Sequence, residues 1–526
     1  MRERILNFLA ESGTLIAPEA MEYLLSKGEP IQFVQGVLNN IDCTPLILTV
    51  EHLQSVEKLA KKAASEGEKQ KKTEAKPKLK PIAVDESIKP ITHFESVEKK
   101  LEGFAELPVV TKKQKALIPV HELPGDIKIL RDITGNSTCE GTIGDFKLYF
   151  NDRLKTLRKI LKEKRQMVGV RELSKVKKAD GTIKIIGMVS DIRTTKNGHK
   201  MIILEDENDS QNVLLTKDSG LASDSTVVDE VIGIIGSKTR DGQLLLAQEL
   251  VRPDVTVNRN PNRSEEDIYV AFVADIHAGS KTFLKEEFEN FLEWLKGNSG
   301  TMRDVAKKVG YLVVPGDTVD GIGIYPDQEE ELAIDDIYGQ YEELARLLSQ
   351  VPEHIKVIMQ PGNHDAVRPA EPQPTFPQEI RDLFPQNVIF TGNPCYFSLH
   401  GVEILAYHGR SMDDFIKALP SLDYGQAIKI MINMLKKRHL VPIYGGRTPI
   451  APEHKDYLVI DRIPDIFVTG HGHSTGLKKY RGITLINASC WQSQTNYQKM
   501  HNFVPDPGKI PIFNLHTGEV SIMDFS

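Results

Sequence analysis

The sequence feature that most constrains the fold is a series of short apolar runs in the C-terminal half of the chain. Each run ends in a polar loop, and helical stretches separate the runs. Short, mostly apolar runs are typical of strands buried in a helix-covered sheet. We therefore predict an α/β sandwich over residues 264–526, with strands at Ile268–Ala274, Tyr311–Val314, Ile355–Met359, Val402–Ala406 and Ile466–Val468.

Five short polar motifs directly follow these runs. A single Asp-x-His or Gly-Asp pair often arises by accident, and a lone histidine at a strand end is usually structural. Five motifs in order, each at the carboxyl end of an apolar run, indicate one shared site. The motifs are Asp275-Ile276-His277, Gly316-Asp317-Thr318-Val319-Asp320, Gly362-Asn363-His364-Asp365, Tyr407-His408-Gly409 and Gly470-His471-Gly472-His473.

The residue types in these motifs suit a pair of divalent metal ions. Two ions about 3.5–4 Å apart can clamp a phosphoryl group and activate a water molecule. A shared carboxylate offsets the repulsion between the ions, and Asp317 is the natural bridge. Side chains alternate along an extended chain, so Asp275 and His277 point the same way, as do His471 and His473. Imidazole and amide ligands suit Mn, Fe or Zn better than Mg or Ca.

The N-terminal quarter of the chain has a different pattern. Residues 1–50 carry apolar side chains at helical spacing, which predicts a small helical unit for docking to another protein. Residues 51–125 include Glu57–Lys80, a stretch with nine Lys, four Glu and few large apolar residues. Such a stretch cannot bury enough surface to offset its chain entropy. We therefore predict a flexible Lys/Glu-rich linker there.

Residues 140–260 predict a basic helix followed by a small barrel. The helix has an apolar stripe of three leucines and an isoleucine between positions 154 and 161. Five short β-type segments follow between Ile183 and Val251, with turn signals at Asn197-Gly198 and Asp241-Gly242. This pattern predicts an OB-type barrel. No Phe, Tyr or Trp lies between Ile183 and Val251, so a scaffold or protein-contact role fits at least as well as base stacking.

Composition excludes several classes of protein. The chain has 66 Lys+Arg against 73 Asp+Glu, a formal net charge of −7, so it is not a basic protein that coats nucleic acid. Its four cysteines include no CxxC pair, which argues against a zinc ribbon and for a reducing compartment. We find no run of about 18 apolar residues that would cross a membrane. We therefore expect a cytoplasmic location and no membrane partner.

The motif set resembles that of the calcineurin-like metallophosphoesterase superfamily, including its DNA-repair nucleases. The resemblance implies a two-sheet phosphoesterase sandwich with two metal ions that share Asp317. It implies that His364 contacts the scissile phosphate and stabilises or protonates the leaving oxygen, with Asp365 orienting its imidazole. The ligands that it implies are Asp275, His277 and His473 for one ion, and Asn363, His408 and His471 for the other.

Three stretches beside the motifs are similar to the small subunits of archaeal family D DNA polymerases. They are GNHDAVRPAEPQP (362–374), RHLVPIYGGRTPIAPE (438–453) and WQSQTNYQ (491–498), and the similarity runs from about residue 130 to the end. This resemblance implies a proofreading 3′→5′ exonuclease with Mn²⁺ as the preferred metal. It also implies a large catalytic subunit as partner and a single-stranded or frayed 3′ end of DNA as substrate, inside an archaeal cell.

Two other functions remain open from the sequence. The chain is alternatively a mainly structural adaptor subunit with little nuclease activity, although its intact ligand pattern weighs against this. It is alternatively a general metal-dependent phosphodiesterase, but such an enzyme needs neither the barrel nor the long insertions.

Several residues near the motifs carry weaker predictions. Arg368 and Arg410 each follow a motif and suit contact with a substrate phosphate, but pairing with a nearby carboxylate explains either arginine equally well. Tyr407 and Trp491 are able to stack a base, although buried packing is more common for both residue types. We interpret Asp320 as a hydrogen-bond acceptor within its loop and not as a metal ligand.

Overall fold

The computed structural model describes residues 15–16, 18–25, 47–48, 125–240, 243–257, 259–500 and 502–526. The chain forms two compact units, Met1–Val110 and Thr111–Ser526. In the first unit, α2 (Pro18–Leu25) lies within the span of the predicted helical unit, and β1 (Leu15–Ile16) pairs in parallel with β2 (Ile47–Leu48). That pairing was not predicted. The remaining residues of the predicted helical unit and residues 51–124 of the predicted linker lie outside the described residues.

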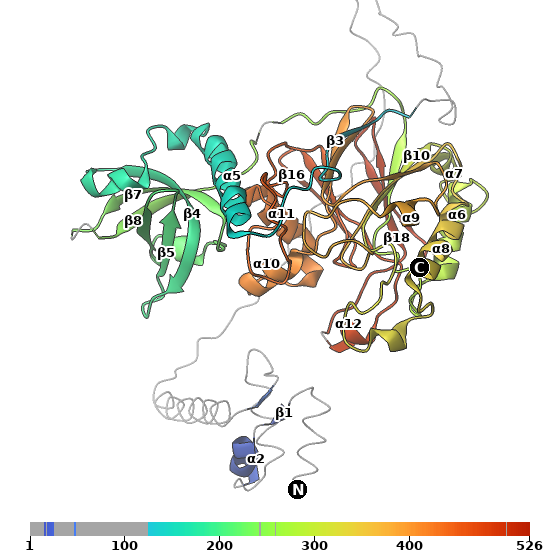
Figure 1. Cartoon of the computed structure of the whole chain (residues 1–526), viewed down its shortest axis with the longest axis horizontal. Helices are drawn as coiled ribbons and strands as arrows, with labels where there is room; N and C mark the ends of the chain where they lie inside the picture. The colour runs from blue at the N-terminus through green and yellow to red at the C-terminus, as the bar shows by residue number, and fades with distance from the viewer. Residues whose placement is uncertain are drawn as a thin grey trace, which may run out of the picture. The chain divides into compact units, whose positions relative to one another are not determined.

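Two six-stranded sheets form the body of the second unit (Figure 1). The first sheet has the order β12-β11-β10-β9-β18-β19, and its strands β9 to β12 run parallel. Its members are β9 (Tyr269–Phe272), β10 (Val309–Pro315), β11 (Lys356–Gln360), β12 (Val388–Phe390), β18 (Lys509–Asn514) and β19 (Val520–Asp524). The second sheet has the order β16-β17-β15-β14-β13-β3. Its members are β3 (Ile127–Arg131), β13 (Cys395–Leu399), β14 (Val402–Ala406), β15 (Ile466–Thr469), β16 (Gly476–Tyr480) and β17 (Ile483–Asn487).

The sheets face each other, and helices cover their outer faces. Alternate residues of β9 and β10 explain the layering, because Phe272 and Val313 pack toward the second sheet while Leu312 packs toward α6 and α8. The predicted two-sheet α/β sandwich is therefore present. The covering helices are α6 (Lys285–Leu295), α7 (Arg303–Ala306), α8 (Ile337–Leu348) and α9 (Gln378–Arg381) on the first sheet, and α10 (Met412–Ala418) and α11 (Ala427–Lys437) on the second.

One strand of the sandwich comes from before the predicted barrel. β3 pairs antiparallel with β13, for example Ile129 opposite Phe397, and extends the second sheet at its edge. The sandwich therefore includes residues that the predicted boundary of 264–526 leaves out. The chain enters the sheet at β3, leaves it to build the barrel, and returns at β9.

The barrel is closed and five-stranded, in the order β4-β5-β6-β8-β7. Its strands lie where the sequence predicts them, and their inward side chains form one apolar core. The assignment to the OB type stays a prediction. The strands are β4 (Ile183–Thr194), β5 (Lys200–Glu205), β6 (Ser210–Leu215), β7 (Val231–Lys238) and β8 (Leu245–Val251).

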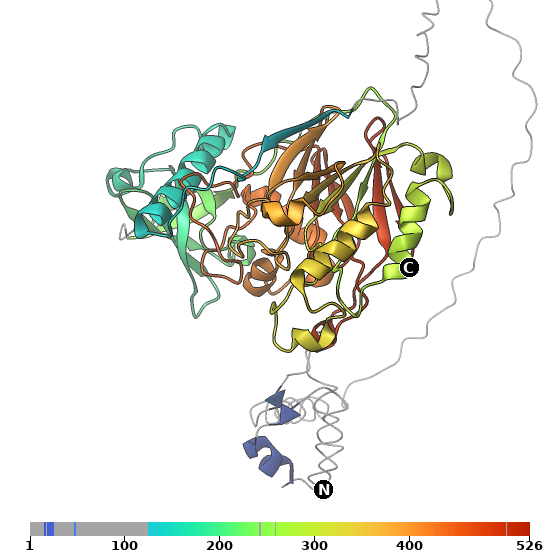
Figure 2. The same cartoon turned by 45° about the vertical axis from the view of Figure 1, so that its right-hand side comes forward.

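Helix α5 (Ile143–Lys162) lies between the barrel and the sandwich (Figure 1; Figure 2 gives a second view). It begins with a capping box, in which the Thr142 hydroxyl accepts from the amide of Asp145 and the Asp145 carboxylate accepts from the amide of Thr142. Leu154, Leu157 and Leu161 of its predicted stripe are buried. None of the described helices is long and apolar enough to cross a bilayer.

Candidate metal centre

The five motifs meet at one end of the sandwich because of the strand directions. β9, β10 and β11 are parallel to one another in the first sheet, and β14 is parallel to β15 in the second. Each motif starts within three residues of the last residue of one of these strands. The carboxyl ends of parallel strands are where α/β folds usually place their ligands. The sequence argument from apolar runs to one shared site is therefore supported by the fold.

The loops at this edge hold an unusual backbone. Asp275, His277, Asp317, His471 and His473 all have φ between 42° and 62°, in the left-handed region that non-glycine residues rarely adopt. Such conformations cost on the order of 1–3 kcal/mol each and cluster at functional sites. The fold therefore maintains these five side chains in place against a local preference for other backbone conformations.

Two glycines permit the close packing of these loops. A Cβ atom at Gly362 would collide with the Asp317 carboxylate, and one at Gly470 would collide with the Asp275 carboxylate. Only glycine allows the neighbouring backbone to approach the two carboxylates this closely.

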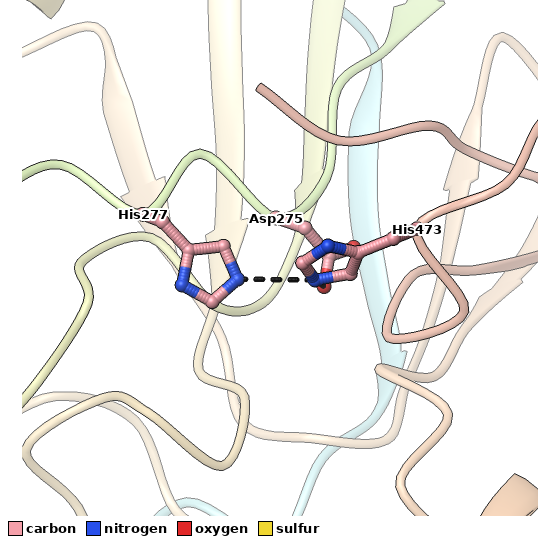
Figure 3. Close-up of side chains that lie close together, drawn as sticks. All are labelled: Asp275, His277 and His473. Atoms are coloured by element: carbon pink, nitrogen blue, oxygen red, sulfur yellow. Dashed lines mark hydrogen bonds and ion pairs between the residues drawn. The ribbon is translucent and has the colours of Figure 1, made fainter. Parts of the chain in front are cut away.

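Asp275, His277 and His473 form the first cluster of donors (Figure 3). Their donor atoms all lie within 4.8 Å of one another. His277 Nε2 is 3.2 Å from His473 Nε2, and His473 Nε2 is 3.4 Å from Asp275 Oδ1. His277 Nδ1 donates to Asp320 Oδ1 over 2.9 Å, which leaves the Nε2 lone pair directed into the cluster. Asp320 accepts this bond from a different loop, and it also lies in a third group of possible metal donors with His277 and His364, so its predicted role within its own loop stays a prediction.

Asp317, His408 and His471 form the second cluster, and Asn363 belongs to it. His408 Nε2 is 3.2 Å from Asp317 Oδ2 and 3.1 Å from Asn363 Oδ1. His408 Nδ1 donates to the Pro315 carbonyl over 3.1 Å, so its Nε2 is the free donor atom. The structure therefore brings together all seven side chains that we predict as ligands.

Asp317 lies between the two clusters. Its Oδ2 atom is 3.2 Å from His408 Nε2 in the second cluster and 3.9 Å from His277 Nε2 in the first. Its Oδ1 atom accepts from the backbone amide of His364 over 2.9 Å, which fixes the carboxylate orientation. This is the position that a bridging carboxylate would need.

When only the protein groups are considered, a protonated His408 imidazole supplies positive charge in this site. Burial disfavours a charged His408, but the Asp317 carboxylate outweighs burial and raises the pKa of His408 to about 9. Burial would raise the pKa of Asp317, yet His408 and His364 hold that pKa well below its usual range. A bound cation would take the place of these protons, so metal binding here would release protons. The imidazole, carboxylate and amide donors fit Mn, Fe or Zn.

His364 and Asp365 do not form the pair that we predict. His364 Nδ1 donates to the backbone carbonyl of Asp320 over 2.7 Å, so this carbonyl orients its ring. The Asp365 carboxylate instead accepts from the amides of Gly362 and Thr318 and from the Tyr341 hydroxyl. The predicted role of Asp365 is corrected accordingly: it braces the loop that carries Asn363 and His364.

The two arginines predicted to contact substrate, Arg368 and Arg410, differ in their position relative to the cavity described below. The guanidinium of Arg368 donates to Glu453 over 2.7 Å and to Ser137, and it does not line the cavity described below. We therefore no longer assign Arg368 to the substrate. Arg410 does line that cavity, and its role stays a prediction. Tyr407 and Trp491 are buried, at 0% and 2% exposure, so packing accounts for both and base stacking does not.

A cavity of about 240 Å³ opens over the two clusters. Besides the predicted residues it is lined by side chains that we did not predict. Asp413 Oδ1 lies 3.2 Å from His471 Nε2, so the Nδ1 atom of His471 is the one left for the second cluster. The side-chain Nε2 atom of Gln498 lies 2.9 Å from His473 Nδ1. The lining comprises His277, Asp317, Asp320, Ile324, Tyr325, Asn363, His364, Arg410, Asp413, Tyr424, His471, His473, Gln492, Thr495, Tyr497, Gln498 and Phe503.

Only part of this unpredicted lining had a sequence signal. Thr495 and Gln498 have the Thr-x-x-Gln spacing of a capping box at the start of α12 (Asn496–Met500), which would have placed Gln498 on a helix. Nothing in the sequence near Asp413 links it to a loop 58 residues away.

Known proteins match the chain over this region. Residues 270–476 match the family of DNA polymerase alpha/epsilon B-subunits. A protein from Archaeoglobus fulgidus named DNA polymerase II small subunit is 46% identical over 74% of this chain and 78% of its own length. The chain belongs to the family of archaeal DNA polymerase II small subunits. Two further members are similar to it, from Methanocaldococcus jannaschii (45% identical over 73% of this chain and 66% of that protein) and from Thermoplasma acidophilum (42% over 81% and 84%).

Proposed function

We propose that the chain is the proofreading subunit of a two-subunit replicative DNA polymerase and hydrolyses the terminal phosphodiester at a 3′ end. The observation that carries this proposal is the convergence of seven side chains, from five separate loops, around the Asp317 carboxylate. The partner is the large catalytic subunit that the family name implies. The substrate is a single-stranded or frayed 3′ end of DNA within the cell.

The ligand assignment follows the two clusters. Asp275, His277 and His473 would hold one divalent ion. Asn363, His408 and His471 would hold the other, and Asp317 would contact both. Two ions, of which Mn²⁺ is our proposed species, would neutralise phosphate charge and activate a water molecule.

His364 is placed to act on the leaving oxygen. A carbonyl oxygen only accepts, so the Nδ1 atom that faces the Asp320 carbonyl carries a proton. The Nε2 atom therefore has a proton only in the charged imidazolium, and it lies 3.9 Å from Asp317 Oδ2 at the edge of the cavity. In that form Nε2–H would donate to the phosphate and then to the departing 3′ oxygen.

The test is degradation of single-stranded DNA labelled at its 5′ end, in Mn²⁺, by the chain alone and with the large subunit. We expect stepwise shortening by the native chain and by His199→Ala, a histidine on the barrel whose Nδ1 accepts from the Lys217 amide. His364→Ala and Asn363→Ala should abolish the shortening. If His364→Ala and Asn363→Ala both shorten DNA at the native rate, this site is not the nuclease.

The alternatives are separated by running this assay beside a test of assembly with the large subunit and a test of hydrolysis of a small phosphodiester. A subunit that assembles with its partner, yet leaves 3′ ends intact with and without it, is a structural adaptor. A chain that hydrolyses a small phosphodiester in Mn²⁺ but leaves DNA intact is a general phosphodiesterase. Either result would remove the exonuclease from the account.

A further inference from the structure

Four aromatic side chains surround the cavity above the metal-ligand clusters. We refer to Tyr325, Tyr424, Tyr497 and Phe503 as the aromatic rim. Tyr325 packs on Tyr497 with ring centroids 5.8 Å apart and an interplanar angle of 35°. Tyr424 packs on Phe503 with centroids 5.6 Å apart. The rim therefore consists of two aromatic pairs, both contributed in part by the segment around α12.

The rim remains accessible from solvent. Tyr497 is 40% exposed and the other three rings are partly exposed, unlike Tyr407 and Trp491. Ile324, which also lines the cavity, is 39% exposed, and Met500 on α12 is 76% exposed. Apolar and aromatic surface of this kind at the opening of a polar site indicates that a ligand group packs there.

The α12 segment connects this rim to the metal-ligand clusters. Gln498 directly follows Tyr497, and the side-chain Nε2 atom of Gln498 lies 2.9 Å from His473 Nδ1. The capping box fixes the start of α12. The backbone amide of Thr495 donates to Gln498 Oε1, and the backbone amide of Gln498 donates to Thr495 Oγ1. Gln494 Nε2 donates to the Phe503 carbonyl and closes the segment. A group held by the rim would therefore have a fixed place relative to the clusters.

Apart from the two proposed metal ions, the side chains that line this cavity supply little positive charge to hold a DNA strand. Arg410 is the only Lys or Arg among the described residues that line it, whereas Asp317, Asp320 and Asp413 are acidic. Proteins that bind single strands usually combine a basic groove with aromatic side chains on which bases stack. Here the aromatic part is present at the site itself, and the cationic part is nearly absent from the described lining.

We propose that the aromatic rim stacks the unpaired terminal base of a 3′ end and so places its phosphodiester over the metal-ligand clusters. This proposal rests on the exonuclease proposed above and names how that site selects its substrate. A paired terminal base must give up its base pair and its stacking on the neighbouring base to reach the rim, whereas a frayed base is already released from both. The rim therefore gives the site its preference for unpaired ends.

The first test is steady-state kinetics with the native two-subunit complex and three variants. Substrates are a primer–template with a paired 3′ end and one with three mismatched terminal nucleotides. Base stacking on an aromatic ring is worth about 1–3 kcal/mol by alanine substitution, which corresponds to roughly 5- to 150-fold. We expect Tyr497→Ala to raise KM for the mismatched end by that factor, with little change in kcat.

Two variants control this result. Tyr497→Phe keeps the ring and should restore the native KM. Tyr338→Ala removes an exposed tyrosine of α8 that does not line the cavity, and it should leave KM unchanged. An unchanged KM in Tyr497→Ala overturns the proposal. A decrease confined to kcat also overturns it, because α12 would then act only through Gln498 and His473.

A second measurement does not depend on hydrolysis. The fluorescence of 2-aminopurine at the 3′ terminus falls when that base stacks. We expect quenching by the native chain and by Tyr338→Ala, and weaker quenching by Tyr325→Ala and Tyr497→Ala. If the native chain fails to degrade DNA, the proposed exonuclease falls, and this fluorescence still decides the question: equal quenching by the native chain and the rim variants overturns base stacking.

Discussion

Two clusters of buried charged side chains differ in how their charges are matched. Where the barrel and α5 meet the sandwich, each buried carboxylate has a cation from the protein. Arg153 Nε donates to Asp456 Oδ2 over 2.9 Å, and Lys437 Nζ lies 3.1 Å from Glu230 Oε2, with all four side chains 0% exposed. In the candidate metal centre, by contrast, the Asp275 and Asp317 carboxylates face imidazoles.

The matching of charges distinguishes a cluster that joins two parts of the fold from a cluster that binds a ligand. The interface cluster is complete without any added component, so its charges serve to join two parts of the fold. The donors of the candidate metal centre converge with their lone pairs directed at one another, and five of them have a left-handed backbone. A cluster that needs something further to balance it is the better candidate for function.

The largest expected effect comes from breaking the interface cluster. Arg153→Met leaves the Asp456 carboxylate buried without its guanidinium partner, and breaking a buried pair in this way costs about 3–5 kcal/mol of unfolding free energy. Urea denaturation measures it. Arg158→Met, on the same helix, removes an ion pair with Glu207 at the surface and should cost at most about 1 kcal/mol.

The comparison also requires that Arg153→Met retain Mn²⁺ binding and 3′ degradation at temperatures where it is folded. Loss of both properties in a folded Arg153→Met would contradict the separation of the two clusters.

A smaller effect is expected from Asp413, the acceptor beside the proposed metal ligand His471. Asp413→Asn weakens the contact that orients His471, and such supporting contacts are typically worth 10- to 100-fold in metal affinity or activity. We expect a loss of about that size in Mn²⁺ affinity by titration calorimetry, with the unfolding free energy nearly unchanged. Asp423→Asn removes a nearby carboxylate that does not line the cavity and serves as the control. Equal affinities for both variants would remove Asp413 from the site.

The smallest effect is a pH dependence at the interface. Burial and the nearby Arg153 guanidinium lower the pKa of His439 to about 4, while an unfolded histidine has a pKa of roughly 6.5. The unfolded chain therefore binds a proton first, so this contribution to stability is complete above about pH 6.5 and is lost as the pH falls toward 4. Between pH 7 and 5.5 the loss should be about 1 kcal/mol.

Urea denaturation of the native chain and of His439→Gln at both pH values measures this contribution. The variant should show a shallower pH dependence over this interval. An identical dependence would mean that His439 is not the group responsible.

The sandwich and the set of donor residues could be predicted from the sequence because both depend on patterns of neighbouring residues. Each apolar run is one strand and each motif lies at its end, so strand direction alone brings Asp275, Asn363 and His471 together. The strands of the barrel were found for the same reason. Turn signals and β-branched runs are properties of neighbouring residues.

The parts that sequence reasoning missed depend on distant contacts. β3 is five residues long and pairs with a strand more than 260 positions later, so its own sequence carries little sign of the sheet that it joins. The partner of His364 is a backbone carbonyl, which any residue at position 320 would supply. Asp413 is likewise identified only by the fold that brings it to His471.

A two-ion site is tested by the number of Mn²⁺ ions bound per chain, measured by equilibrium dialysis and elemental analysis. The account predicts two ions for the native chain and at most one for Asp317→Ala, since this carboxylate lies between the two clusters. His199→Ala should bind two, as the native chain does. A native chain that binds no Mn²⁺, or an Asp317→Ala variant that still binds two ions with native affinity, would contradict the account.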